Sequence, residues 1–193
     1  MNVSNSFLSV LEDHASVVSK LRQDYQPVIM ASELIINTIE QGKKLLLCGN
    51  GGSAADSQHI AAEFVVRYAK ERRALPAIAL TTDSSILTAH SNDYDFSTVF
   101  SRQIEAITNT GDCLIAISTS GNSHNITEAA KRAKQLGLNV IGMTGEEGGE
   151  LKELVDINIA APSKVTARVQ EMHMLVAHWW CESVDIAVTN SGK

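Results

Sequence analysis

The chain has 193 residues and a net charge of −6, with 44% hydrophobic and 20% charged residues. This length suits one domain with a substantial core, and the composition excludes an intrinsically disordered protein. The negative charge argues against a nucleic-acid groove as the main function, and three scattered cysteines exclude a disulfide framework.

The first forty residues show two apolar stripes at helical spacing, one within residues 7–18 and one within 29–39. Pro27 marks the break between the two helices, and Gly42 ends the second. We predict a helical extension over residues 1–42 that packs on the core or on a partner subunit. Because the start of the chain lacks the pattern of a signal peptide and no apolar stretch is long enough to span a bilayer, we expect a cytoplasmic protein.

From residue 43 onward, short apolar runs alternate with helical patterns. Strands are predicted at residues 43–48, 77–80, 112–117, 138–143 and 156–160. Helices are predicted at residues 53–69, 84–91, 96–108, 123–136 and 165–188. The alternation predicts an α/β fold over residues 43–188, in which a parallel-stranded sheet is flanked by helices on both faces. Residues 189–193 are expected to form a disordered tail.

Two strand-to-helix junctions, residues 49–53 and 118–123, are rich in glycine and hydroxyl side chains. Free backbone N–H groups and the positive end of a helix dipole meet at such junctions, so each can hold a phosphate. A tight turn followed by serine helix caps is the alternative for either loop alone. Neither loop has the Walker lysine or the dinucleotide-binding glycine pattern. Two such loops on one edge of the sheet favour a small phosphorylated sugar.

His59 and Glu63 lie four residues apart on the helix that follows the first loop. This spacing places both side chains on one face, where they can share a metal or act as an acid–base couple. The same spacing is common in weak ion pairs on exposed helices, so the pair alone leaves both alternatives open.

The predicted C-terminal helix carries several polar side chains among apolar ones, so these groups need partners. They are Arg168, Gln170, Glu171, His173 and His178. Gln170 and His173 are one turn apart and would converge, whereas Gln170 and His178 lie about 12 Å apart along the axis. Spacing alone therefore does not select the ligands, and ordinary hydrogen-bonded polar residues remain the alternative.

Taken together, these segments resemble the SIS-domain family and, within it, the bacterial phosphoheptose isomerases. The resemblance rests on residues 48–53, His59-x-x-x-Glu63, Arg67-Tyr68, Asn92-Asp93, residues 118–123, Thr144-Gly145 with Gly148-Gly149, and the stretch from Arg168 to His178. It implies a flavodoxin-like three-layer sandwich. It also implies an isomerase that converts sedoheptulose 7-phosphate to D-glycero-D-manno-heptose 7-phosphate through an enediol, for lipopolysaccharide heptose biosynthesis.

The resemblance further implies one zinc ion per subunit and a homotetramer with active sites at subunit interfaces. The metal ligands would be His59, Glu63, Gln170 and His178, which selects His178 over His173. Glu63 and His178 would be the catalytic residues, the first acting on the carbon-bound proton and the second on the oxygens.

The implied substrate-binding residues are Asn50, Gly51, Gly52, Ser53, Asn92, Asp93, Ser118, Thr119, Ser120, Ser123 and Gln170. A close relative shares the fold but binds the replication initiator instead of catalysing. A non-catalytic SIS protein of that kind is the alternative function.

Overall fold

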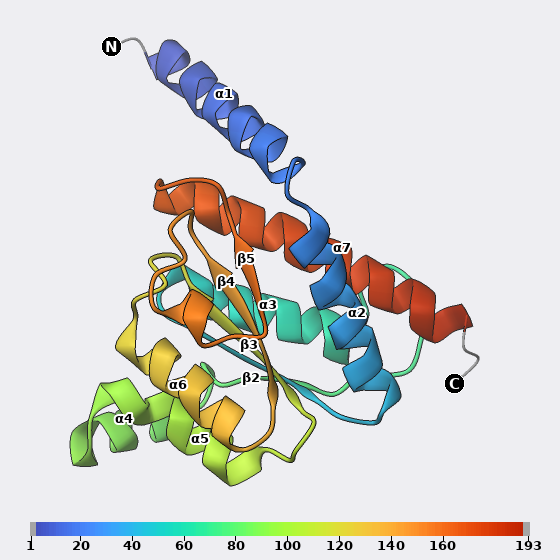
Figure 1. The fold of residues 1–193 in the computed structure, drawn as a ribbon, viewed down its shortest axis with the longest axis vertical. Helices are drawn as coiled ribbons and strands as arrows, with labels where there is room; N and C mark the ends of the chain where they lie inside the picture. Colours follow the sequence, from blue (N-terminus) through green and yellow to red (C-terminus); the bar gives the residue numbers. More distant parts are fainter. Residues whose placement is uncertain (1–2, 191–193) are drawn as a thin grey trace.

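The computed structural model describes residues 3–190 and contains a five-stranded sheet between two layers of helices (Figure 1). The strands are β1 (Leu45–Gly49), β2 (Ala77–Ala79), β3 (Cys113–Ser118), β4 (Asn139–Thr144) and β5 (Ile157–Ala160). Their order is β2-β1-β3-β4-β5, and every neighbouring pair is parallel. The structure therefore confirms the predicted parallel α/β sandwich and all five strands.

One face of the sheet is covered by α2 (Gln26–Glu40), α3 (Gly52–Val65) and α7 (Thr166–Asn190). Alternate strand residues such as Leu47 and Ile115 point into this layer, where they meet Phe64 and Trp180 in one core cluster. The fully buried indole of Trp180 donates from Nε1 to the backbone oxygen of Val28 at 3.0 Å, so it links α7 to α2. Helix α2 thus belongs to the same core as the sheet.

The other face is covered by α4 (Ser84–Asp93), α5 (Val99–Ile107) and α6 (His124–Gln135), with short 3₁₀ turns at Phe96–Thr98 and Leu151–Glu153. Leu46 and Leu114 point into this layer and pack with Phe100 and Ile126. The helix predicted at residues 96–108 is therefore a 3₁₀ turn followed by α5. Because side chains alternate between the faces of a strand, the two cores use alternate residues of the same strands.

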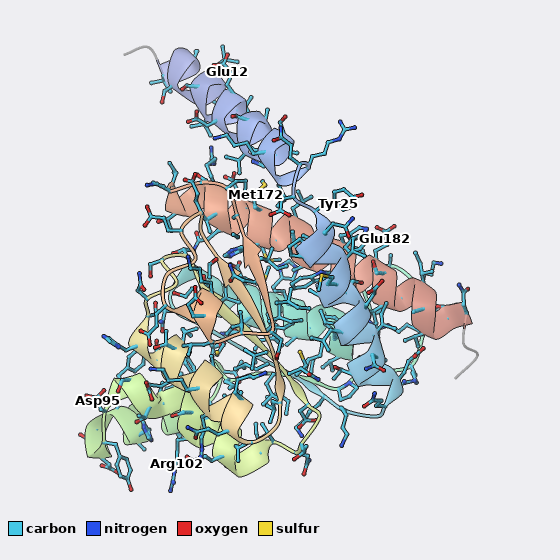
Figure 2. The ribbon with its side chains drawn as sticks, in the orientation of Figure 1. Glu12, Tyr25, Asp95, Arg102, Met172 and Glu182 are labelled. Carbon is cyan, nitrogen blue, oxygen red and sulfur yellow. The ribbon has the colours of Figure 1, made fainter. Side chains whose placement is uncertain are left out.

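Helix α1 (Val3–Leu21) lies largely clear of the rest of the chain (Figure 1). Its second half contacts α7, where Val17 packs with Ala161, Val169 and Met172. Figure 2 shows Met172 on α7 and Glu12 on α1, between Val10 and His14, which contact Arg168 and Glu171 of α7. Helix α7 extends to Asn190, so the tail predicted from residue 189 begins with two helical residues, and 191–193 lie outside the described part.

The strand order places β1 and β3 side by side, with the connections after them leading to opposite faces of the sheet. This is the topological switch point at which parallel α/β sheets bind ligands, beyond the carboxyl ends of the strands. Loops 49–53 and 118–123 follow these two strands. Within residues 3–190, no helix is long and apolar enough to cross a membrane.

Candidate active site

The first glycine-rich loop joins β1 to α3 through a turn that only glycine adopts easily. Gly51 has φ +56° at the helix N-cap, in the region that L side chains disfavour. A Cβ on Gly49 would lie 2.5 Å from the backbone oxygen of Ser53, so the turn closes tightly on the start of the helix. Ser53 is buried within this turn. The sequence therefore fixes a helix N-terminus at the switch point, where an anion is favoured.

The second loop gathers hydroxyl groups at the start of α6. Ser118 Oγ donates to Ser123 Oγ at 3.0 Å, and Ser120 Oγ accepts from the backbone N–H of Asn122 at 3.1 Å. Gly121, with φ +69°, allows the loop to contact residues 148–149, because a Cβ there would lie 2.0 Å from the oxygen of Gly148.

A cavity of about 230 Å³ opens beside this second loop. Thr119 and Ser120 line it together with Glu146 and with Glu147, which is paired with Lys164. The hydroxyl groups of Thr119 and Ser120 thus border an open polar space whose other side carries two carboxylates.

A pair of amides bridges the two loops. Asn50 Nδ2 donates to Asn125 Oδ1, and Asn125 Nδ2 donates to Asn50 Oδ1, both at 2.8 Å. Asn125 is buried in the first turn of α6. Sequence reasoning missed Asn125, although its position just after the serine-rich loop was a usable signal. The structure places the Asn50 side chain in this bridge.

The histidine–glutamate pair lies on the half-exposed side of α3, beside α7. His59 Nε2 is 3.2 Å from Glu63 Oε1. The rings of His178 and His59 meet in a T-shaped arrangement, with 5.2 Å between centroids, and Tyr68 stacks on His178 at 5.7 Å. The structure thus brings together one carboxylate and two imidazoles from helices distant in sequence.

Gln170 lies at the opposite end of the same helix pair. A Cβ on Gly52 would be 2.3 Å from Gln170 Nε2, so the amide rests against the first turn of α3. Helices α3 and α7 therefore run side by side in the same direction, with Gln170 beside the loop and His178 beside His59. Gln170 therefore lies at the end of the helix pair that is formed by loop 49–53.

His173 is turned away from these groups, into the protein. It is 1% exposed, and its Nε2 lies 3.0 Å from the backbone oxygen of Thr144. Burial lowers the pKa of His173 to about 4, so the ring is neutral near pH 7. The expectation from local spacing that Gln170 and His173 converge is therefore wrong, because the two side chains contact different parts of the fold.

Asp56 is a further polar side chain that sequence reasoning did not single out. It lies on α3 three residues before His59, and its Oδ2 is buried without a hydrogen-bond partner in the described structure. Burial raises the pKa of Asp56, and the nearby His59 partly opposes this shift. Its spacing from His59 was the signal in the sequence.

Asn92 and Asp93 lie apart from the other predicted residues within one chain. Both are exposed at the end of α4, where Asn92 Nδ2 donates to Asp93 Oδ1 at 2.8 Å. Helix α4 belongs to the layer on the other side of the sheet from α3 and α7 (Figure 1). A single chain therefore does not gather the whole predicted set.

The proposed metal ligands are side chains of the types that bind zinc, but their positions in the structure do not form a metal site. Two imidazoles, a carboxylate and an amide oxygen are donors that zinc accepts. His59, Glu63 and His178 are neighbours, but within residues 3–190 no three His, Cys, Asp or Glu side chains are arranged to hold a metal ion. The carboxylate of Glu63 faces His59 instead.

Comparison with known proteins shows likeness over nearly the whole chain. A family model described as the SIS domain matches residues 11–145. A phosphoheptose isomerase of Aliarcobacter butzleri is 51% identical over 183 residues, which cover 95% of each chain. The solved phosphoheptose isomerase of Francisella tularensis is 36% identical with a TM-score of 0.92, covering 96% of this chain and 99% of that one. The corresponding structure from Neisseria gonorrhoeae is 39% identical with a TM-score of 0.89, covering 95% and 99%.

Proposed function

Because the chain belongs to the SIS-domain family, we propose that it is an enzyme, a ketose–aldose isomerase that converts sedoheptulose 7-phosphate to D-glycero-D-manno-heptose 7-phosphate for heptose biosynthesis. Its relatives named phosphoheptose isomerase match it over almost their full length. The observation that carries the proposal is the meeting of Glu63 and His59 on α3 with His178 on α7, since α3 begins at the first phosphate-type loop.

The reaction moves a proton between two neighbouring carbons of the sugar. Glu63 takes the proton from C1 of the ketose and returns it to C2 through an enediol, and His178 exchanges protons with the two oxygens. The 3.2 Å contact with His59 orients the Glu63 carboxylate. Positioned acid–base groups of this kind contribute about 10²- to 10⁴-fold in rate.

Binding of the phosphate is assigned to the two loops. The N-termini of α3 and α6 present dipoles and backbone donors at one edge of the sheet, and Ser53, Ser118, Thr119, Ser120 and Ser123 add hydroxyl groups. A phosphate held mainly by amides and hydroxyls suits a small sugar phosphate, since a nucleotide triphosphate site would add a Walker lysine.

Zinc is part of the proposal, with His59, Glu63, Gln170 and His178 as the residues that would hold it. His59, Glu63 and His178 are neighbours in one chain, and Gln170, which lies beside Gly52, would have to turn toward them. When bound, the ion would polarise the substrate carbonyl. Purified protein analysed by mass spectrometry for metal content, before and after chelation, tests the site. The zinc assignment fails if no metal co-purifies and the stripped enzyme keeps its full rate.

We further propose a cytoplasmic homotetramer with active sites between subunits. Two observations support the assembly. Phe7, Leu8 and Leu11 on α1 are 63%, 56% and 49% exposed, so an apolar surface is open to a partner subunit. Asp93 lies across the sheet from Glu63, so it would join the site of another subunit. The free, buried state of all three cysteines suits a reducing compartment. Sedimentation of the wild type and of a Phe7→Ser/Leu11→Ser variant tests the assembly, and a monomeric wild type would contradict it.

The decisive test of the enzyme is Glu63→Gln with sedoheptulose 7-phosphate as substrate. We expect turnover to fall by about 10³-fold or more while folding and sugar-phosphate binding are retained. Glu153→Gln is the matched control, since its carboxylate is exposed and its 3₁₀ turn packs on the other face of the sheet from α3 and α7.

If the wild type does not interconvert ketose and aldose phosphates, with or without added zinc, the proposal of an enzyme is contradicted. That result would favour a non-catalytic protein that binds the replication initiator. A panel of five-, six- and seven-carbon sugar phosphates sets the chain length of the substrate.

A further inference from the structure

A buried arginine outside the predicted site contacts the backbone of Glu63. The Arg72 side chain is 3% exposed. Its Nη2 donates to the backbone oxygen of Glu63 at 2.7 Å, and its Nη1 donates to the oxygen of Phe64 at 2.8 Å. Its Nε donates to Asp185 Oδ1 at 2.8 Å, and the Asp185 side chain is 1% exposed.

These bonds cap the C-terminal end of α3. The last carbonyls of a helix have no partner within the helix and carry the negative end of its dipole. Arg72 supplies both the donors and the positive charge, and α3 ends at Val65. Since Glu63 lies in this last turn, the direction of its side chain depends on how the turn is held.

The second oxygen of Asp185 holds the loop after α3. Asp185 Oδ2 accepts from the backbone N–H groups of Ala69 and Lys70 at 2.9 and 3.0 Å. The residue just before them, Tyr68, stacks on His178 with 25° between the rings. Because α7 carries both Asp185 and His178, the loop, the aromatic ring and the helix are fixed as one unit.

We propose that Arg72 and Asp185 are a positioning pair that sets Glu63 and His178 in register for proton transfer. The inference rests on the proposed function, because it concerns the same carboxylate and imidazole. Neither residue is assigned a contact with the substrate. Both are buried, and their hydrogen bonds go to each other and to the backbone of residues 63–73.

A purely structural role is the competing explanation, and the chain offers a matched control for it. Lys44 Nζ lies 2.5 Å from Asp112 Oδ2, and these side chains are 18% and 1% exposed. Asp112 also accepts from the backbone N–H groups of Lys44 and Asn109. This pair ties the amino-terminal starts of β1 and β3, at the opposite edge of the sheet from the loops.

The experiment compares Asp185→Asn, Arg72→Lys and Arg72→Ala with Asp112→Asn. For each protein, kcat and KM for sedoheptulose 7-phosphate and the thermal midpoint are measured. Asp185→Asn and Arg72→Lys are the conservative substitutions of the pair. We expect each of them to lower kcat by about 10- to 100-fold, which is the scale of a small misplacement of reacting groups. KM should change by less than about threefold, because the phosphate loops are untouched.

Asp112→Asn should lower the thermal midpoint by about as much as Asp185→Asn does, and it should leave kcat unchanged. Added guanidinium at non-denaturing concentrations should restore part of the kcat of Arg72→Ala, since it can occupy the vacated position. If Arg72→Ala does not fold, Asp185→Asn and Arg72→Lys decide the question.

The inference is overturned if Asp185→Asn and Arg72→Lys keep the wild-type kcat, or if Asp112→Asn loses as much kcat as they do. Its failure is distinct from failure of the proposed function. If only the inference fails, the wild type isomerises the sugar and Glu63→Gln does not. If the proposed function fails, the wild type itself shows no turnover.

Discussion

His173 makes the stability of the fold depend on pH in a way that can be calculated from its surroundings. Its Nε2 faces the backbone oxygen of Thr144, which can only accept, so Nε2 carries the proton. Its Nδ1 is buried without a hydrogen-bond partner in the described structure. A second proton on Nδ1 would create a buried, unpaired charged donor, and burial accordingly lowers the pKa of His173 from 6.5 to about 4.

The sign of the effect follows from proton counting. Between pH 6.5 and 4 the unfolded chain binds a proton that the folded chain does not, so acid favours unfolding. The stabilisation is complete above pH 6.5 and is lost as the pH falls toward 4. A shift from 6.5 to about 4 corresponds to about 3 kcal/mol in the free energy of unfolding, of which about 2 kcal/mol is lost by about pH 5.

Urea unfolding of the wild type and of His173→Gln, at several pH values between about 7.5 and 5, measures the contribution of His173 to the free energy of unfolding. Glutamine keeps an N–H donor for Thr144 and cannot titrate, so the difference between the two proteins cancels the contribution of the carboxylates. The difference in unfolding free energy should shrink by about 2 kcal/mol from pH 7.5 to 5. Two curves that stay parallel over this range would refute the reasoning.

Three substitutions at the loops test how closely the site is packed. Gly49→Ala places a Cβ 2.5 Å from the backbone of Ser53, so we expect a loss of about 2–3 kcal/mol in unfolding free energy, measured by urea titration. Gly52→Ala meets only the mobile end of Gln170, so stability should change by less than about 1 kcal/mol while kcat/KM falls. Asn125→Ala leaves the amide of Asn50 unpaired and should cost about 1–3 kcal/mol, with a higher KM for the sugar phosphate.

The sheet and both loops were predictable because their signals are local. A continuous apolar run such as residues 45–48 has no polar face, so it fits only a strand that is covered on both sides. A glycine- and serine-rich segment between such a run and a helical pattern must lie at a helix N-terminus. The parallel connections then bring loops 49–53 and 118–123 to the same edge of the sheet.

The C-terminal end of α3 was not predictable from its own residues. The helical pattern continues to residue 69, whereas the helix ends at Val65. The cause lies elsewhere in the chain. Asp185 accepts hydrogen bonds from the backbone N–H groups of Ala69 and Lys70. Arg72 donates hydrogen bonds to the backbone oxygens of Glu63 and Phe64. Tertiary hydrogen bonds thus override the local preference of residues 66–69.

The partners of Gln170 were hidden for a related reason. Spacing within α7 favours His173, because residues three apart share a helix face. The alignment of α3 beside α7 decides instead, since it places Gly52 next to Gln170 and His59 next to His178. The side-by-side register of two helices is a property of the packed core, and the periodicity of neither helix contains it.

This register also bears on the length of the substrate. Ser53 lies in the first turn of α3 and Glu63 in its last turn, and ten residues of helix separate them by about 15 Å along the axis. A phosphate at the first turn and a reacting carbon at Glu63 therefore require a long, extended sugar, even after side chains reach inward. A three-carbon phosphate held at Ser53 would leave its carbonyl short of the carboxylate. On this geometry kcat/KM should fall steadily from seven- to five-carbon substrates, and equal rates across the series would place the phosphate elsewhere than at the start of α3.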